Sequence, residues 1–284
     1  MKKILLTGKD GQVGWELQRT LAPLGEVIAL DRKALDLSDA DAIRAALRAT
    51  HADIIVNAAA YTAVDQAEKE SDLAMAINGL APGVMAEEAK KIGALLVHYS
   101  TDYVFDGAGE TPFGEDAAVN PLNVYGRSKL AGERAIQAVG GRHLILRTSW
   151  VYGLRGKNFL RTILRLAQEK EELRIVADQF GAPTWSRMIA EATALMLARQ
   201  TATEGLFHFT STGATSWHGF TEAILELTRE QRAREPKVTG IPAREYPLPA
   251  ARPLNSRLSC QRLQRETGIA LPHWRDALAL CLAQ

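Results

Sequence analysis

The chain has 284 residues, of which 46% are hydrophobic and 24% charged, the composition of an ordinary globular protein with room for two domains. Its formal net charge of +1 gives no overall basic field, so we expect neither nucleic acid nor a membrane as a partner. The two cysteines, Cys260 and Cys281, show neither metal-ligand spacing nor a disulfide framework. No signal peptide and no membrane-spanning run is recognisable, so a cytoplasmic location is expected.

Five short apolar runs have the length of buried strands and are rich in Ile, Val and Leu. They are Lys3–Gly8, Glu26–Asp31, Asp53–Ala59, Ala94–Asp102 and His143–Val151. Segments with helical spacing lie between them, at Gln12–Leu24, Asp39–Thr50, Asp72–Ile92 and Ser128–Val139. This alternation predicts an α/β fold, a Rossmann-type doubly wound parallel sheet that binds ligands beyond the carboxyl ends of its strands.

The second half of the chain is less regular and predicts a smaller C-terminal α/β domain that binds substrate. Helices are expected over Asn158–Leu173 and Ser216–Gln231, a strand over Leu206–Phe209 and an extended loop over Pro236–Pro253. We place the boundary near Val151, so that residues 1–150 form the dinucleotide-binding domain and residues 151–284 mainly the substrate-binding domain. A segment near residues 182–212 could return to the first domain.

The stretch "TGKDGQVG" places Gly8, Gly11 and Gly14 three residues apart, between the first strand and the first helix. Glycines there permit a tight turn and a close approach of the backbone to a pyrophosphate. Asp31 ends the second strand, at a distance suited to the ribose hydroxyls of an adenosine. This context predicts a nicotinamide dinucleotide site, although simple turn glycines and a helix cap at Asp31 would give the same pattern.

The residues around Asp31 leave the choice between NADH and NADPH open. Asp31 favours a free 2′-hydroxyl, as in NADH, whereas its neighbour Arg32 could pair with the 2′-phosphate of NADPH. Asp36 and Leu37 follow in a loop that could cover the adenine or, equally, cap the next helix.

The stretch "NVYGRSKLAGE" places Tyr125 and Lys129 four residues apart, on one face of a helix. A phenol has a pKa of about 10, and a nearby ammonium lowers this pKa toward the working range of a proton donor. The spacing alone is weak evidence, but the preceding strand ends in "YSTDYVF", where the Thr101 hydroxyl could hold a carbonyl oxygen. Together the three groups predict proton transfer to a carbonyl at the mouth of the dinucleotide site.

Longer strings carry a more specific signal. "TGKDGQVG", "NAAAYTAVD", "YSTDYVFDG" and "YGRSK" resemble the extended short-chain dehydrogenase/reductase superfamily. "GQVGWELQ", "INGLAP", "PLNVYGRSKLAGE", "RTSWVYG", "DQFGAPT" and "RPLNSRLS" resemble one family in it, dTDP-4-dehydrorhamnose reductase. The resemblance runs from Lys3 to about Trp274. It implies NADPH- or NADH-dependent reduction of the 4-keto group of a dTDP-sugar, the last step of dTDP-L-rhamnose synthesis.

The resemblance also implies a role for each matching position. Tyr125 would protonate the 4-keto oxygen, Lys129 would tune Tyr125 and bind the nicotinamide ribose, and Thr101 would hold the substrate oxygen. The cofactor would be lined by Gly8, Gly11, Gln12, Val13, Gly14, Asp31, Arg32, Asp36, Leu37, Ala58, Ala60, Tyr61, Thr62, Tyr99, Tyr125 and Lys129. The substrate would contact Thr101, Asp102, Val104, Trp150, Asn158, Gln179 and Arg252. Taken singly, Trp150 could also be a core residue and Arg252 a solvated cation.

One position departs from the family pattern. The resemblance implies that some members pair through a magnesium ion held by glutamates at a dimer interface, and Glu16 matches one of those glutamates. The position that would carry another is Arg187, a cation unsuited to the oxygen shell of a hard metal ion. A magnesium-linked dimer is therefore not expected, and both a monomer and a homodimer remain open.

Other functions fit parts of the sequence. A sugar-nucleotide epimerase would keep Tyr125 and Lys129, whereas a 4,6-dehydratase would carry a glutamate where this chain has Tyr103. A non-catalytic subunit, such as the regulatory subunit of methionine adenosyltransferase, would have no need of an intact Thr101, Tyr125 and Lys129. These residues favour a reductase.

Overall fold

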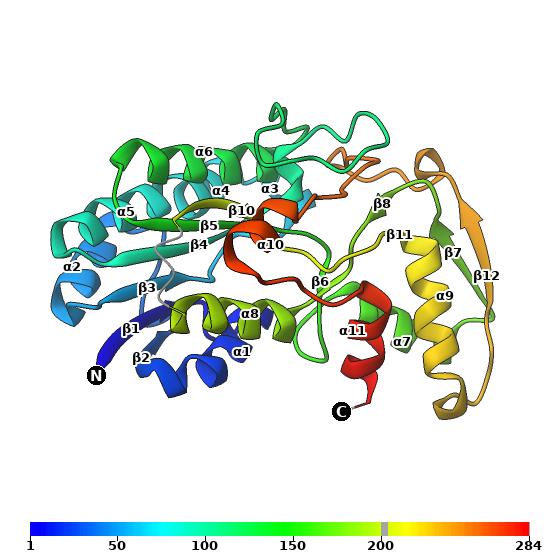
Figure 1. The fold of residues 1–284 in the computed structure, drawn as a ribbon. Coiled ribbons are helices and arrows are strands. Elements are labelled where there is room, and N and C mark those ends of the chain that lie inside the picture. The colour runs from blue at the N-terminus through cyan, green and yellow to red at the C-terminus, as the bar shows by residue number, and fades with distance from the viewer. Residues whose placement is uncertain (200–203, 284) are drawn as a thin grey trace.

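The structure is a computed structural model that describes residues 1–199 and 204–283 (Figure 1). Its centre is a sheet of six parallel strands in the order β10-β5-β4-β3-β1-β2. These are β1 (Lys2–Thr7), β2 (Gly25–Leu30), β3 (Ile54–Asn57), β4 (Leu95–Thr101), β5 (His143–Thr148) and β10 (Gly205–His208). The strand order reverses at β1, since β2 lies on one side of it and β3 on the other. Sheets of this kind bind ligands at such a reversal.

Helices cover both faces of the sheet (Figure 1). One face carries α1 (Gln12–Thr20) and α8 (Ser186–Ala198), and the other carries α2 (Ala40–Thr50), α5 (Ala81–Ile92) and α6 (Val124–Val139). Alternate residues of β1 divide between the two apolar cores, because successive side chains of a strand point to opposite faces. Ile4 and Leu6 pack in the core under α1 and α8, and Leu5 packs in the core under α2 and α5. The doubly wound α/β fold expected from the sequence is confirmed.

The remaining chain forms a smaller lobe beside the carboxyl ends of the sheet (Figure 1). Its strands form three pairs, which are β7 (Glu172–Val176) with β12 (Lys237–Ile241), β6 (Val151–Tyr152) with β9 (Thr184–Trp185), and β8 (Phe180–Gly181) with β11 (Thr215–Ser216). Its helices are α7 (Phe159–Glu169), α9 (Trp217–Leu227) and α11 (Trp274–Leu282). These helices share an apolar core that includes Leu160, Phe220 and Trp274. A further helix, α10 (Gln261–Thr267), packs Leu263 into the core under α1 and α8.

Two expectations for this lobe are wrong. The helix expected over Asn158–Leu173 ends at Glu169, because Lys170 has extended backbone angles (φ −114°, ψ 147°), and the chain continues as β7. The loop expected over Pro236–Pro253 contains β12, which pairs in parallel with β7. The run "KVTGI" lies between two prolines, and its β-branched residues favour a strand.

Two helices in the segments that carry the predicted site also have bounds that differ from the expected ones. The helix expected over Ser128–Val139 begins at Val124, because the Asn123 side chain caps it by accepting a hydrogen bond from the Gly126 amide, at 2.8 Å. Tyr125 therefore lies in the first turn of α6. The helix expected over Asp72–Ile92 is divided into α4 (Ser71–Met75), a π-helical turn η2 (Ala76–Leu80) and α5. Single π-turns of this kind often occur at functional sites.

The stretch 182–212 contains α8, which packs on α1, and β10, which pairs with β5. Residues 200–203 of this stretch lie outside the described residues, as does residue 284 at the end of the chain. None of the helices in residues 1–199 and 204–283 is both long and apolar enough to span a membrane.

Candidate functional site

The turn from β1 into α1 requires glycine at two positions. Gly8 has a φ of +72°, and a Cβ there would lie 2.7 Å from the backbone nitrogen of Ala59. A Cβ on Gly14 would lie 2.1 Å from the Gly8 carbonyl oxygen. The glycines thus let α1 start directly behind β1. Its N-cap, Gly11, provides no side-chain cap, and its first turn holds no acidic residue, so its free N–H groups suit an anion.

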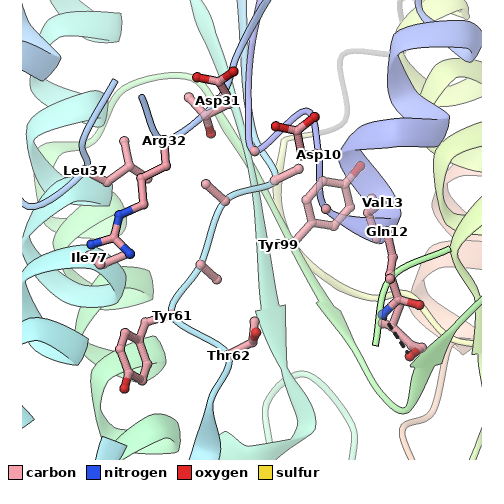
Figure 2. Close-up of a pocket in the computed structure, with 18 of the residues that line it drawn as sticks. Asp10, Gln12, Val13, Asp31, Arg32, Leu37, Tyr61, Thr62, Ile77 and Tyr99 are labelled. Atoms are coloured by element: carbon pink, nitrogen blue, oxygen red, sulfur yellow. Dashed lines mark hydrogen bonds between the residues drawn. The ribbon is translucent and has the colours of Figure 1, made fainter. Parts of the chain in front are cut away.

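A cavity of about 600 Å³ opens beside this turn, a size common for ligand sites in proteins. Figure 2 shows Arg32, Leu37 and Tyr61 on one side of it and Gln12 and Val13 on the other. Every residue expected around the cofactor lines this cavity except Gly14, which packs α1 against the turn. The glycine turn, the free N–H groups of α1 and the other residues around the cavity therefore fit a nicotinamide dinucleotide.

Sequence reasoning did not single out several other lining residues, among them Asp10, Ile77, Ser100, Gly156 and Lys157. Asp10 lies inside "TGKDGQVG" and Ser100 inside "YSTDYVF", so their neighbours in the sequence are a signal for both. Gly156 and Lys157 lie in an irregular loop after β6, for which the sequence gives no local signal.

Asp31, which directly follows β2, is bonded to the Lys9 side chain and to two backbone amides. Lys9 Nζ lies 3.1 Å from Asp31 Oδ2, and the amides of Lys33 and Ala34 donate to Asp31 Oδ1 at 3.0 and 2.9 Å. The backbone bond from Ala34 and then the Lys9 side chain lower the pKa of Asp31 below its usual value. Asp31 is therefore ionised at neutral pH, and Lys9 partly balances its charge.

The predicted catalytic groups lie together at the carboxyl end of β4. Thr101 is the last residue of β4, and Tyr125 and Lys129 lie on α6, which packs against that strand. The Thr101 hydroxyl lies close enough to the Tyr125 phenol to influence its pKa. Lys129 is buried, donates to the Tyr99 carbonyl oxygen at 2.5 Å, and has Nζ 3.2 Å from His98 Nε2.

The pKa of Tyr125 is shifted in the opposite direction to the one expected from the sequence. Burial raises the pKa of Tyr125 to about 12, and the neighbouring Thr101 hydroxyl offsets this only in part. The expected effect of Lys129 is absent because its ammonium is turned toward Tyr99 and His98 instead. Burial also lowers the pKa of Lys129 to about 8, although Glu133 opposes this shift.

The glycines of "YGRSKLAGE" are explained by close packing of α6. A Cβ on Gly126 would lie 2.2 Å from the Tyr103 carbonyl oxygen, and one on Gly132 would lie 2.2 Å from the Asn78 carbonyl oxygen. Helix α6 therefore lies directly against the segment after β4 and against the π-turn. The Tyr103 ring meets Tyr125 edge to face, with centroids 5.7 Å apart.

Comparisons with known proteins agree with this arrangement. The family model described as RmlD substrate binding domain matches residues 1–284. The dTDP-4-dehydrorhamnose reductase of Burkholderia thailandensis is 51% identical over 291 residues, which cover 99% of this chain and 98% of that protein. The chain belongs to the dTDP-4-dehydrorhamnose reductase family. The family resemblance drawn from the sequence motifs is thereby confirmed.

Solved structures of the reductase family have the same fold. The enzyme of Bacillus anthracis in complex with NADP superposes with a TM-score of 0.92 at 34% identity, covering 99% of each chain. The enzyme of Clostridium acetobutylicum gives a TM-score of 0.93 at 37% identity, covering 99% of this chain and 98% of that one.

The residues that the reductase resemblance assigns to substrate do not line the large cavity. Asp102 follows Thr101 and accepts a hydrogen bond from its hydroxyl, at 3.0 Å. Arg252 forms two bonds to the Asp65 carboxylate, at 2.9 and 2.7 Å, and so ties the late chain to the first domain. Gln179 is buried in the turn between β7 and β8.

Three further substrate candidates have clear structural contacts. Asn158 caps α7 and also donates to Gln12 Oε1 at 2.8 Å, which links the smaller lobe to the cavity. Trp150 has a φ of +48° and stacks on Trp217. The Val104 side chain is fully buried in an apolar cluster with Phe105 and is not brought to the cavity.

The magnesium site of some reductase family members does not fit the residues present here. Glu16 Oε2 lies 3.3 Å from Arg187 Nε, so this carboxylate is paired with a guanidinium, a cation that disfavours a metal ion beside it. Within the described parts of the chain, no cluster of three or more His, Cys, Asp or Glu side chains is arranged around a metal position.

Proposed function

We propose that this protein reduces the 4-keto group of dTDP-4-dehydro-L-rhamnose to give dTDP-L-rhamnose, with NADPH or NADH as the reductant. The observation that carries the proposal is that Tyr125 and Lys129 line the glycine-rich cavity, with Thr101 beside Tyr125 at the end of β4. The 51% identity to a named reductase over almost the whole chain supports the substrate.

Each lobe has its own task in this proposal. Residues 1–150, together with the returning stretch near 182–212, hold the dinucleotide between the Gly8–Gly14 turn and the Asp31 loop. The rest of residues 151–284 binds the dTDP-sugar. When bound, the reduced nicotinamide supplies a hydride to C4 of the sugar.

Tyr125 supplies the proton that the new alkoxide at C4 requires. A pKa of about 12 keeps the phenol protonated at neutral pH, so it is a donor before the reaction. Thr101 lies beside Tyr125 and, once its hydroxyl turns away from the Asp102 carboxylate, is placed to donate to the same substrate oxygen and so to orient the carbonyl. Lys129, one turn along α6, lines the cavity and is placed to bind the nicotinamide ribose.

The test is to incubate the purified protein with dTDP-4-dehydro-L-rhamnose and either NADPH or NADH. Loss of the reduced-nicotinamide absorbance, equimolar with the dTDP-L-rhamnose formed, is the expected result. Absence of oxidation with both cofactors would falsify the reductase proposal. An epimerase would convert the sugar without net consumption of cofactor, and a binding subunit would bind the dinucleotide with no turnover, so the same assay separates all three.

A further inference from the structure

The loop between β6 and α7, residues 153–158, brings the smaller lobe onto the first turn of α1. Gly156 has a φ of +75°, and a Cβ there would lie 3.3 Å from Gln12 Cγ. Asn158 Nδ2 donates to Gln12 Oε1 and to the Gly153 carbonyl oxygen, each at 2.8 Å. Because Gln12 is the first residue of α1, these contacts hold the loop against the end of the helix that has free N–H groups.

A second contact fastens the same loop to α1. The Arg155 guanidinium lies over the Trp15 indole, with Cζ 3.4 Å from the ring centroid. A guanidinium is attracted to the face of an indole, so this contact favours the observed position of the loop. Arg19 also lies over this indole, at 3.9 Å, but it belongs to α1 itself and holds no other segment. The two arginines thus share one ring, and only Arg155 connects it to the loop.

The glycine-rich turn itself offers no free cation to a diphosphate. Residues 8–14 contain two charged side chains, Lys9 and Asp10. Lys9 is paired with Asp31, with Nζ 3.1 Å from Oδ2, and Asp10 lines the cavity as an acid. An anion bound at the start of α1 would therefore meet a negative side chain of the turn and no unpaired positive one.

Lys157 brings a positive charge to this place from the other lobe. Its neighbours in the chain, Gly156 and Asn158, both contact Gln12, and Lys157 itself lines the cavity. Its side chain is exposed, and no carboxylate of the described residues is paired with it. Arg32, another cation that lines the cavity, lies on the far side of it from Gln12 (Figure 2).

We propose that Lys157 binds the pyrophosphate of the dinucleotide and that the Trp15–Arg155 stack positions the loop that carries it. The proposal rests on the dinucleotide site of the proposed function, but not on the sugar that is reduced. The pyrophosphate is then held between the two lobes, by the amides of α1 on one side and by an ammonium on the other. A lysine suits this role because it is a compact charge on a flexible stem, and the backbone amides already fix the anion.

The first experiment measures binding without the sugar, so that its result does not depend on turnover. Dissociation constants are measured for NADPH and ADP-ribose, which contain a pyrophosphate, and for adenosine 2′-phosphate, which does not. Lys157→Ala should weaken NADPH and ADP-ribose by about fivefold, and adenosine 2′-phosphate by less than about twofold. Lys157→Arg should retain most of the affinity. Lys170→Ala is the matched control, since it removes an exposed lysine of the same lobe that does not line the cavity.

Other results of this binding experiment contradict the proposal. Equal weakening of all three ligands in Lys157→Ala would show a general effect of charge, and weakening of NADPH alone would place the contact at the nicotinamide. Unchanged affinities would show that Lys157 makes no contact. If the parent protein reduces no sugar but Lys157→Ala has the expected effects, the reductase function fails and the role of Lys157 stands.

The second experiment tests the Trp15–Arg155 stack with a double-mutant cycle. Arg155→Ala should speed amide hydrogen exchange over residues 153–158 and weaken NADPH by about threefold, because Lys157 is then less well positioned. Arg19→Ala is the control, and it should have neither effect. In a Lys157→Ala background, Arg155→Ala should not weaken NADPH further, since the stack acts through Lys157. Fully additive weakening, or faster exchange in Arg19→Ala as well, contradicts the positioning role.

Discussion

The indole of Trp150 lies flat on the indole of Trp217, with ring centroids 3.5 Å apart and planes 7° apart. Trp150 also has a left-handed backbone, at φ +48°, which costs about 1 kcal/mol or more for a residue with a side chain. Gly181 also lies close to this indole, since a Cβ added to Gly181 would lie 2.6 Å from Trp150 Cε2. Gly181 and Trp217 together therefore fix the position of a strained residue beside the proposed substrate site.

Replacement of Trp217 by alanine should weaken substrate binding and leave cofactor binding unchanged. Loss of one stacked face removes about 0.5–1.5 kcal/mol of aromatic contact, so KM for the dTDP-sugar should rise up to about tenfold. Steady-state kinetics and a titration with NADPH measure the two effects. Trp217→Phe is the control and should restore most of the loss. An unchanged KM in Trp217→Ala would show that Trp150 needs no such support.

Tyr125→Phe should abolish most turnover while the fold and the cofactor site remain. A positioned proton donor contributes roughly 10²–10⁴-fold to the rate, and phenylalanine retains the ring that packs edge to face on Tyr103. We expect kcat to fall by that amount with an unchanged dissociation constant for NADPH. The control is Tyr103→Phe, which keeps the neighbouring ring and should remain active. Full activity in Tyr125→Phe would exclude this residue as the donor.

The sequence predicted the central sheet because buried parallel strands are continuous apolar runs bounded by glycine, as in "KILLTG". It did not predict β12, since a five-residue edge strand between two prolines has no such signature. The cofactor residues were accessible because the Gly8–Gly14 turn is local. Contacts such as Trp150 on Trp217, or Thr7 with Asn57, depend on tertiary packing between distant segments and leave no local pattern.

The Lys9–Asp31 ion pair should influence the choice between NADPH and NADH. Without Lys9, the ionised Asp31 carboxylate faces the 2′ position uncompensated and repels a 2′-phosphate more than a 2′-hydroxyl. Lys9→Ala should therefore raise KM for NADPH by about tenfold and change KM for NADH by less than about twofold.

Kinetics with both cofactors at low and high salt measure this effect of Lys9, and added salt should reduce it. Asp31→Asn is the reciprocal control, which should lower KM for NADPH. If Lys9→Ala changes both KM values by the same factor, the ion pair has no part in cofactor selection.

Asp102 should make the stability of the protein depend on pH. Burial is the main cause that raises the pKa of Asp102 to about 6 from an ordinary value of 3.8, against the opposing hydrogen bonds from Ser256 and Thr101. The folded state therefore binds a proton more tightly than the unfolded state does, so this group destabilises the fold increasingly as the pH rises from about 4 to 6. The penalty reaches about 3 kcal/mol above that range.

Asp102→Asn removes this penalty, since the amide remains neutral at every pH. The variant should be more stable than the parent by up to about 3 kcal/mol near pH 7.5 and nearly equal to it near pH 4, as measured by urea unfolding at both pH values. Asp106→Asn is the matched control, because Asp106 is a neighbouring carboxylate whose pKa is lowered, first by the Ala108 amide and then by Asn120. That variant should lose stability at neutral pH. An Asp102→Asn variant with the same stability difference at both pH values would show that Asp102 does not titrate between them.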